Sequence, residues 1–197
     1  MIEVKIMDTP GKRDDIIRVA LELFAENGFH GTPVAMIAKK AGVGAGTIYR
    51  YFENKDVLIN ELFADLERKF MVAIEDGYNP NKPIRERFIH IAATILKYSI
   101  SHPLYFRYIE QYQNSPYGVS FRRDKLLGKS DDHDLLRELF NEGIAQQVLK
   151  DLPLPVLFAL AFGPLIAIAR DHILGFSILN DTLILKFVEA CWGGIKR

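Results

Sequence analysis

Residues 32–52 read TPVAMIAKKAGVGAGTIYRYF, and two short helical patterns meet in this stretch across the turn Ala41-Gly42-Val43. Thr32 occupies the expected N-cap position of the first pattern, and Pro33 suits its first helical position. Gly42 is a typical helix stop. A supporting helix, a tight turn containing glycine and a second short helix have the layout of a helix-turn-helix, whose second helix enters the major groove of DNA.

Helical periodicity continues on both sides of this motif, and no strand pattern persists. Before the motif, apolar residues from Ile17 to Phe24 recur at helical spacing and stop at Asn27-Gly28. The pattern over 83–101 is apolar around most of its circumference, which is typical of the central helix of a bundle. The sequence therefore predicts an all-α protein, with further helices at about 54–77, 135–144, 155–174 and 181–195.

Charge is balanced over the whole chain but concentrated at the motif. The 197 residues carry 25 Lys and Arg against 25 Asp and Glu. Residues 32–55 nevertheless contain four cations against the single carboxylate of Glu53. This excess suits a surface that meets phosphates. From periodicity alone, an αα-hairpin with solvated lysines remains an alternative.

A set of residues with regular spacing extends beyond the motif. Its members are Ala20, Leu23, Phe24, Gly28, Phe29, Thr32, Ile37, Ala38, the turn 41–43, the run 46–49, Tyr51, Phe52, Asn54 and Lys55. Together they resemble the N-terminal domain of tetracycline-repressor (TetR) type transcriptional regulators. The resemblance implies a three-helix DNA-binding domain over 10–53, with its helix-turn-helix motif at about 33–52. It also implies a larger helical regulatory and dimerisation domain over 54–197.

The resemblance further implies that the protein is a transcriptional regulator, more often a repressor than an activator in function. Such a regulator binds a palindromic operator in double-stranded DNA as a homodimer and responds to an effector. The DNA contacts that it assigns are Thr32, Gly44, Ala45, Gly46, Thr47, Tyr49, Arg50 and Lys55.

These DNA contacts have distinct expected roles. Residues 44–47 would face base edges, Tyr49 and Arg50 would reach phosphates or bases, and Thr32 and Lys55 would contact the DNA backbone. Neither Gly44 nor Ala45 has a side chain that donates to a base, although many family members carry polar residues there. Direct readout is therefore expected from Thr47, Arg50 and a thymine-methyl contact by Ala45, with a further share from DNA shape.

Aromatic residues gather between Tyr98 and Phe121. They favour two interpretations equally: core packing where short helices cross the central one, or a pocket for an apolar or aromatic small-molecule effector. In the second case the expected lining is Tyr98, Phe106, Tyr108, Tyr112 and Phe140.

The last two helical patterns are more apolar than one buried face requires, which predicts a dimer interface by two-fold symmetry. The residues expected in it are Leu157, Leu160, Ala161, Leu165, Ile168, Ile184, Phe187, Val188, Cys191 and Trp192.

Other functional classes have weaker support in the sequence. Cys191 is the only cysteine, which fits a reducing cytoplasm, and we expect no cofactor, no metal and no catalytic site. The uncharged run 152–169 is interrupted by proline and glycine, so we expect a buried helix and no membrane partner. Glycines 42, 44 and 46 suggest a nucleotide loop, but a helical pattern precedes them where that loop needs a strand. A regulator without an effector and a helical enzyme remain the alternatives.

Overall fold

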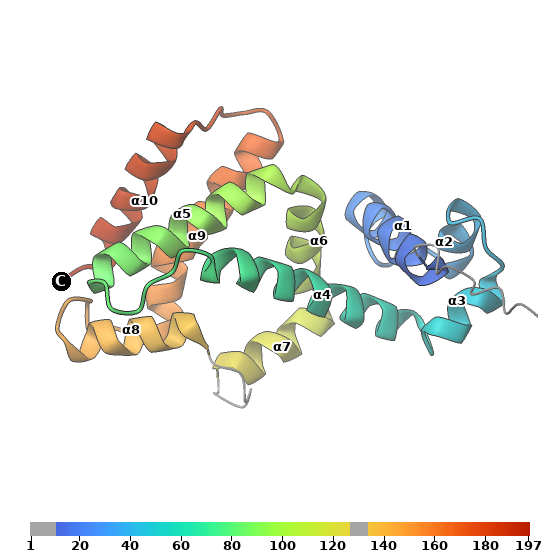
Figure 1. The fold of residues 1–197 in the computed structure, drawn as a ribbon, viewed down its shortest axis with the longest axis horizontal. Helices are drawn as coiled ribbons and strands as arrows, with labels where there is room; N and C mark the ends of the chain where they lie inside the picture. The colour runs from blue at the N-terminus through green and yellow to red at the C-terminus, as the bar shows by residue number, and fades with distance from the viewer. Residues whose placement is uncertain (1–10, 127–133) are drawn as a thin grey trace, which may run out of the picture. The chain divides into compact units, whose positions relative to one another are not determined.

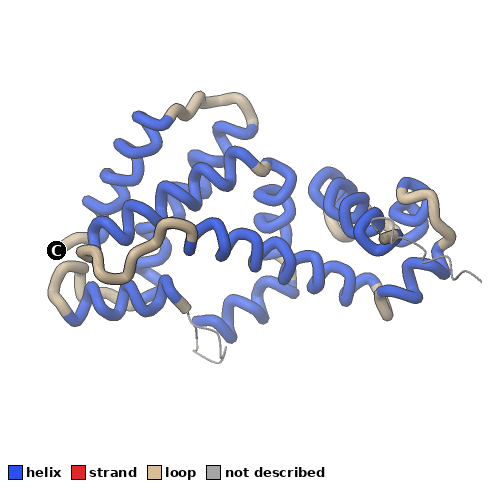
Figure 2. The backbone as a smooth tube through the Cα atoms, viewed as in Figure 1, coloured by secondary structure: helices blue, strands red, loops and turns tan. Residues whose placement is uncertain are grey.

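The computed structural model describes residues 11–126 and 134–197. In this part of the chain, ten α-helices are joined by loops and turns (Figure 1), and Figure 2 shows no strand there. The prediction of an all-α protein is therefore confirmed. The helices are α1 (Lys12–Asn27), α2 (Val34–Lys40), α3 (Ala45–Tyr51), α4 (Lys55–Glu75), α5 (Ile84–Ser101), α6 (Pro103–Gln113), α7 (Pro116–Leu126), α8 (Leu135–Ala145), α9 (Leu154–Ile173) and α10 (Asp181–Ile195).

Short polar side chains define several helix starts. Asn54 begins α4 by accepting a hydrogen bond from the backbone N–H of Val57 at 2.9 Å. Asn180 does the same for α10, where its side-chain oxygen accepts from Leu183 N–H at 2.9 Å. Each bond satisfies a backbone donor that a helix N-terminus leaves without a partner. The cap expected from Asn54 is thus present.

The chain contacts divide the protein into two units. The first unit contains the chain up to Glu67 together with residues 104–119, and the second contains residues 68–103 and 120–197. Helix α4 passes from one unit into the other. The first unit therefore extends beyond the domain boundary predicted at residue 53, because it includes the first part of α4, α6 and the beginning of α7.

The first unit has one apolar core beneath its three N-terminal helices. Helix α1 packs against α2 and α3, and α2 packs against α3. The side chains that close this core are fully buried, and they include Ile16, Phe24, Ile37, Ile48, Phe52, Leu58, Ile59 and Tyr108.

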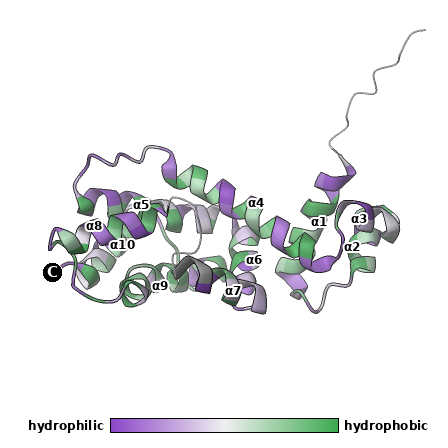
Figure 3. Cartoon of the chain, turned by 90° about the horizontal axis from the view of Figure 1, so that it is seen from below, coloured by the Kyte–Doolittle hydropathy of each residue, from purple (hydrophilic) through white to green (hydrophobic). Residues whose placement is uncertain are grey.

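The second unit is a helical bundle around α5. This helix packs against α8, α9 and α10, and α9 packs against α10, so the predicted central helix is central in this unit. Phe88 of α5 meets Phe140, Phe162 and Trp192, with ring centroids 5.5–6.3 Å apart. Hydrophobic residues, green in Figure 3, also run along α9. Within the described ranges, α9 is the one helix whose length and composition would allow it to cross a membrane.

Candidate DNA-binding interface

The turn between α2 and α3 has a fixed geometry. The N–H of Gly42 donates to the carbonyl of Lys39 at 3.3 Å, and the N–H of Val43 donates to the carbonyl of Ala38 at 3.0 Å. These two bonds are the pair that defines a Schellman motif, and Gly42 has the left-handed φ of +67° that the motif requires. A side chain with a Cβ would be strained there. The turn thereby sets the direction in which α3 leaves α2.

Helix α3 is held by its inner side chains and leaves its outer side bare. Ile48 is 2% exposed, and Phe52 is buried beneath the guanidinium of Arg13, which lies 5.3 Å from the ring centre. Residues 44–46 and Arg50 are exposed, Tyr49 is 54% exposed, and Thr47 is half-buried. The six predicted contacts from the motif turn and α3 therefore share the accessible side of one element.

Several accessible polar groups of α2 and α3 make no bond to another described residue. Among the described residues, the hydroxyls of Thr47 and Tyr49 and the ammonium of Lys39 have no hydrogen-bond or ion-pair partner. Arg50 lies over the ring of Tyr51 at 5.6 Å, which leaves its N–H groups unengaged in any ion pair with a described carboxylate. Donors without intramolecular partners can bond to phosphates and base edges without first breaking a protein contact.

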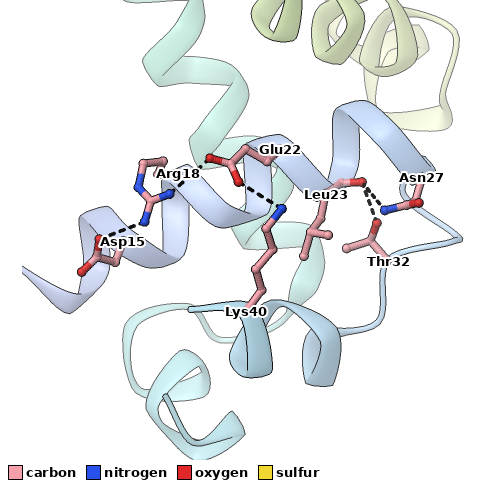
Figure 4. A network of polar contacts seen from close by, with 7 residues as sticks. All are labelled: Asp15, Arg18, Glu22, Leu23, Asn27, Thr32 and Lys40. Atoms are coloured by element: carbon pink, nitrogen blue, oxygen red, sulfur yellow. Dashed lines mark hydrogen bonds and ion pairs between the residues drawn. The ribbon is translucent and has the colours of Figure 1, made fainter. Parts of the chain in front are cut away.

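Lys40, next to Lys39, is engaged in an ion-pair network on α1 (Figure 4). Its ammonium lies 3.1 Å from the carboxylate of Glu22, which also meets Arg18 at 3.2 Å. The hydrogen bond from Lys40 is the main reason that the pKa of Glu22 lies below its usual value. The two neighbouring lysines therefore differ, because Lys40 forms an ion pair with Glu22 and Lys39 has no partner among the described residues.

Thr32 is bonded within the first unit and is not presented to solvent. Its side chain is fully buried, and its hydroxyl donates to the carbonyls of Leu23 and Gly28 at 3.1 and 2.9 Å (Figure 4). The residue before α2 is Pro33, and no side chain caps this helix. Thr32 thus ties the α1–α2 loop to the end of α1 through its O–H group, which donates to the same Leu23 carbonyl that also accepts from the side-chain amide of Asn27 at 3.2 Å.

Lys55 is likewise engaged inside the first unit. Its ammonium donates to the carbonyl of Phe29 and lies 5.9 Å from the ring centre of Phe24. Partial burial lowers the pKa of this ammonium. The structure therefore gives Lys55 a positioning role, in which it fastens the start of α4 to the α1–α2 loop, and the predicted contact with the DNA backbone would require this bond to open.

The five predicted effector-lining residues do not form one group. Phe106, Tyr108 and Tyr112 lie in α6 and belong to the first unit, whereas Tyr98 and Phe140 belong to the second. Tyr108 is fully buried and packs against Phe29 at 5.5 Å between ring centroids, so it is core of the DNA-binding unit. The five residues therefore come from both units, and the effector lining stays a prediction.

Sequence reasoning missed a set of bonds that α6 and α7 make to α4. The hydroxyl of Tyr108 donates to the carbonyl of Ile59 at 2.6 Å, and that of Tyr112 donates to the side-chain oxygen of Asn60 at 2.8 Å. Tyr117 adds a third bond, to the carboxylate of Asp56 at 2.6 Å. The spacing of Tyr108 and Tyr112, one helical turn apart, was the available signal.

The predicted dimer residues fall into three classes of burial. Seven of them are buried inside the second unit: Leu157, Ala161, Leu165, Ile184, Val188, Cys191 and Trp192. Ile168 and Phe187 are half-buried, and Leu160 is exposed. Besides Leu160, the residues of α9 and α10 that face away from the core of this chain include Val156, Ala159, Gly163, Ala167, Ala190 and Gly193. The dimer interface itself stays a prediction.

Two other kinds of site were weighed from the sequence. Within residues 11–126 and 134–197, no group of three His, Cys, Asp or Glu side chains is placed to hold a metal. The glycines at 42, 44 and 46 follow helix α2, so the strand that a nucleotide loop requires is not what precedes them.

Family models match most of the chain. A model described as bacterial regulatory proteins of the tetR family matches residues 16–62. A second model, described as a tetracyclin repressor-like C-terminal domain, matches residues 83–196, which is more than half of the chain. The first match contains α2, the turn and α3, where the accessible donors lie.

Similar proteins are transcriptional regulators. An HTH-type regulator from Haemophilus influenzae is 25% identical over 185 residues, which cover 93% of this chain and 95% of that protein. The fatty acid metabolism regulator protein of Bacillus subtilis is 40% identical over 72 residues, and another HTH-type regulator of the same organism is 29% identical over 96 residues. The chain covers only 37% and 50% of the lengths of these two Bacillus proteins.

Solved structures agree with this relationship. A TetR family transcriptional regulator from Vibrio parahaemolyticus has 31% identity and a TM-score of 0.74, with 95% of this chain and all of that chain covered. A regulator from Shewanella sp. PV-4, at 24% identity, shares the fold with a TM-score of 0.81 over 95% of this chain and 99% of its own. The chain therefore belongs to the tetR family of bacterial regulatory proteins and is a transcriptional regulator.

Proposed function

We propose that the protein is a cytoplasmic, ligand-responsive repressor that binds a palindromic operator as a homodimer. The observation that carries this proposal is the accessible side of α3, where Thr47, Tyr49 and Arg50 have no ion-pair or hydrogen-bond partner among the described residues. A fixed glycine turn presents this side, and buried Ile48 holds it in place.

The proposed DNA contacts follow from accessibility. Residues 44–46 approach base edges closely because they carry no large side chain, and Thr47 bonds to a base edge. Tyr49, Arg50 and Lys39 contact phosphates or, for Arg50, a guanine. Lys55 acts through α4, which it fastens to the α1–α2 loop.

Dimerisation is proposed through the outer stripe of α9, which consists of Val156, Leu160, Gly163 and Ala167. Their spacing of four, three and four residues places them on one side of the helix, and all four are exposed. An added Cβ at Gly163 would meet no atom within 4 Å, so packing within this chain does not require a glycine there. Small residues on such a stripe allow a second helix to approach closely.

A charged substitution tests this interface. Leu160→Arg is expected to give monomers and to weaken operator binding, because it places two guanidinium groups in an apolar contact. Val72→Arg is the matched control, since Val72 is also exposed in the second unit but lies on α4. If the Leu160→Arg variant dimerised with the affinity of the wild type, the proposed α9 interface would be contradicted.

For the effector, we propose an apolar or aromatic small molecule that contacts the ring cluster of the second unit. Phe158 and Phe162 are half-buried and stand 5.9 Å apart at the edge of the cluster around Phe140. Helix α5 contributes Phe88 to the same cluster. Fatty acids are a first class to test, since they are apolar and one relative is a fatty acid metabolism regulator.

We propose that effector binding in the second unit reaches the DNA-binding helices through the connection between α5 and α6. A ligand that shifts α5 moves α6, because only His102 separates these helices. Helix α6 is bonded to α4 through Tyr108 and Tyr112, and to α1 through Gln111, which donates to the carbonyl of Ala25 at 3.2 Å. The effector would thereby favour a state in which the two α3 helices no longer fit successive major grooves.

Selection of bound duplexes from a random DNA library tests the proposed function. The expected result is an inverted repeat whose half-sites are about one helical turn, roughly 34 Å, apart or a multiple of it. Enrichment of no sequence would contradict operator binding. For the effector, a compound that raises the melting temperature and releases the selected duplex supports ligand response, and one that does neither is excluded.

A further inference from the structure

The guanidinium of Arg13 joins three helices of the first unit. Arg13 is the second residue of α1, and its Nη2 donates to the carboxylate of Glu61 on α4 at 2.6 Å. The same guanidinium lies over the ring of Phe52, 5.3 Å from the ring centre. Phe52 is the residue directly after α3 and is 1% exposed. The Arg13 cluster thus consists of Arg13, Phe52 and Glu61, one from each of α1, the end of α3 and α4.

The two charges of the Arg13 cluster pair with each other alone. Among the described residues, Glu61 forms an ion pair with no cation other than Arg13, and Arg13 with no carboxylate other than Glu61. Ile16, three residues after Arg13, and Leu58, three residues before Glu61, are fully buried. This helical spacing places both charged groups beside the core of the unit, on the sides of α1 and α4 that pack inward.

Different contacts hold the two ends of α3. The glycine turn fixes the start of the helix, as its Schellman bonds show. The end of the helix is Phe52, whose ring is enclosed between the core and the guanidinium of Arg13. Tyr49 and Arg50, two proposed DNA contacts, precede Phe52 by three and two residues. A shift at the end of α3 would therefore move both of these side chains.

We propose that Arg13 and Glu61 are positioning residues for DNA binding, which hold the end of α3 in the orientation that fits the major groove. Their role rests on the proposed function, in which the accessible side of α3 meets DNA. Arg13 acts through Phe52 and not as a phosphate ligand, because its guanidinium is engaged by the ring and by the carboxylate. A helix that has its binding orientation for only part of the time binds with an affinity reduced by that fraction.

Removing either charge should therefore weaken binding to the operator. For Arg13→Gln and for Glu61→Gln, we expect a loss of about threefold per subunit and about tenfold for the dimer, the size of effect that exposed ion pairs and cation–π contacts have. Glu61→Gln is the sharper variant, since it removes a negative charge. Electrostatics alone predicts tighter binding to DNA for this variant, whereas the positioning role predicts weaker binding to the operator. In an Arg13→Gln background, Glu61→Gln should cause no further loss.

Two matched control variants lie on α1. Arg18 is exposed and forms its ion pairs with Asp15 and Glu22 of its own helix (Figure 4). Glu26 is exposed and has no ion pair with a described residue. Arg18→Gln and Glu26→Gln thus make the same charge changes without loosening the end of α3. Both should keep the wild-type ratio of operator affinity to random-DNA affinity.

Fluorescence anisotropy tests the positioning role, with the selected duplex and with random DNA, at several salt concentrations and below the melting temperature of every variant. The expected result is a ratio of operator to random affinity about tenfold lower in Arg13→Gln and Glu61→Gln, with the salt slope of the wild type. A purely stabilising contact would lower the melting temperature and leave this ratio unchanged, which would overturn the role. A slope shallower by about 1.8 in Arg13→Gln would also overturn it, because Arg13 would then bind a phosphate.

Thr47→Ala distinguishes failure of this role from failure of the proposed function. If Thr47→Ala lowers the ratio of operator to random affinity while Arg13→Gln and Glu61→Gln do not, only the positioning role fails. If all three variants keep the wild-type ratio, the proposed reading of DNA by α3 fails as well.

Discussion

Comparing Lys39→Ala with Lys55→Ala distinguishes a lysine that we propose to contact DNA from a lysine that stabilises the fold. The ammonium of Lys39 has no partner among the described residues, so it is expected to neutralise one phosphate per subunit. Each phosphate contact contributes about 0.9 to the magnitude of the slope of log K for operator binding against log salt concentration. Because a dimer loses two such contacts, its slope should become shallower by about 1.8. The ratio of wild-type to Lys39→Ala affinity for the operator should consequently fall about twelvefold as the salt concentration rises from about 50 to about 200 mM.

Lys55→Ala is expected to behave differently. It removes the hydrogen bond to the carbonyl of Phe29, a charged and partly buried contact, and should cost about 1 kcal/mol of unfolding free energy. Its salt slope should remain that of the wild type at temperatures where the protein is folded. Lys186→Ala, an exposed lysine of α10, is the matched control and should change neither quantity.

Fluorescence anisotropy with the selected duplex, at four salt concentrations, gives the slopes, and urea unfolding gives the stabilities. A wild-type slope in Lys39→Ala, or a slope lowered by about 1.8 in Lys55→Ala, would refute the assignment of these two lysines.

Three further predictions concern single side chains. Thr47→Ala should cost about 1–3 kcal/mol per half-site on the selected duplex and barely change the affinity for random DNA; an equal loss on both would show that Thr47 reads no base. Tyr108→Phe keeps the ring but loses the bond to Ile59, so urea unfolding should show a loss of about 1 kcal/mol, and an unchanged stability would contradict the bond. The bond to Asp56 raises the pKa of Tyr117 to about 12 from its ordinary value near 10. The folded state therefore favours the neutral phenol, and this stabilisation is complete below pH 10 and is lost as the pH rises to 12. Tyr117→Phe should make the alkaline loss of unfolding free energy shallower, which unfolding at pH 8 to 11.5 measures.

Local patterns were sufficient to predict the two helices of the motif and most of the other helices. Asn54 stands three residues before the N–H that it accepts from, and Gly42 lies within the turn that needs its φ. Both signals act over a few residues, so a single sequence contains them. The same holds for the central position of α5, because a helix that is apolar around most of its circumference has to be covered on several sides.

Partners far away in the sequence explain the contacts of Lys55 and Tyr108 that the sequence did not predict. Lys55 has the position of a DNA ligand, but its acceptor, Phe29, lies 26 residues earlier. Tyr108 was expected at an effector site, and its acceptor lies 49 residues earlier in α4. Nothing in the sequence near either residue indicates these partners, since they depend on which helices the fold brings together.

For α9, hydrophobic periodicity does not predict which side of the helix is buried. It showed that this helix is apolar on two sides, but it does not say which side faces α5 and α10. The structure buries Leu157, Ala161 and Leu165 and leaves Leu160 and Gly163 outside. Small residues on the outer side were the missed signal, because a core seldom needs a glycine around which an added Cβ would meet open space.

Photo-crosslinking from α3 to DNA tests the central claim most directly. A benzophenone-bearing phenylalanine analogue is placed at Tyr49, which is 54% exposed on α3, and in a second variant at Val119, which is 49% exposed on α7 in the same unit. The account predicts that the variant at 49 crosslinks to bases or sugars in both half-sites of the selected duplex, and that the variant at 119 does not. Crosslinking from 119 with none from 49 would contradict the proposal that the accessible side of α3 meets DNA.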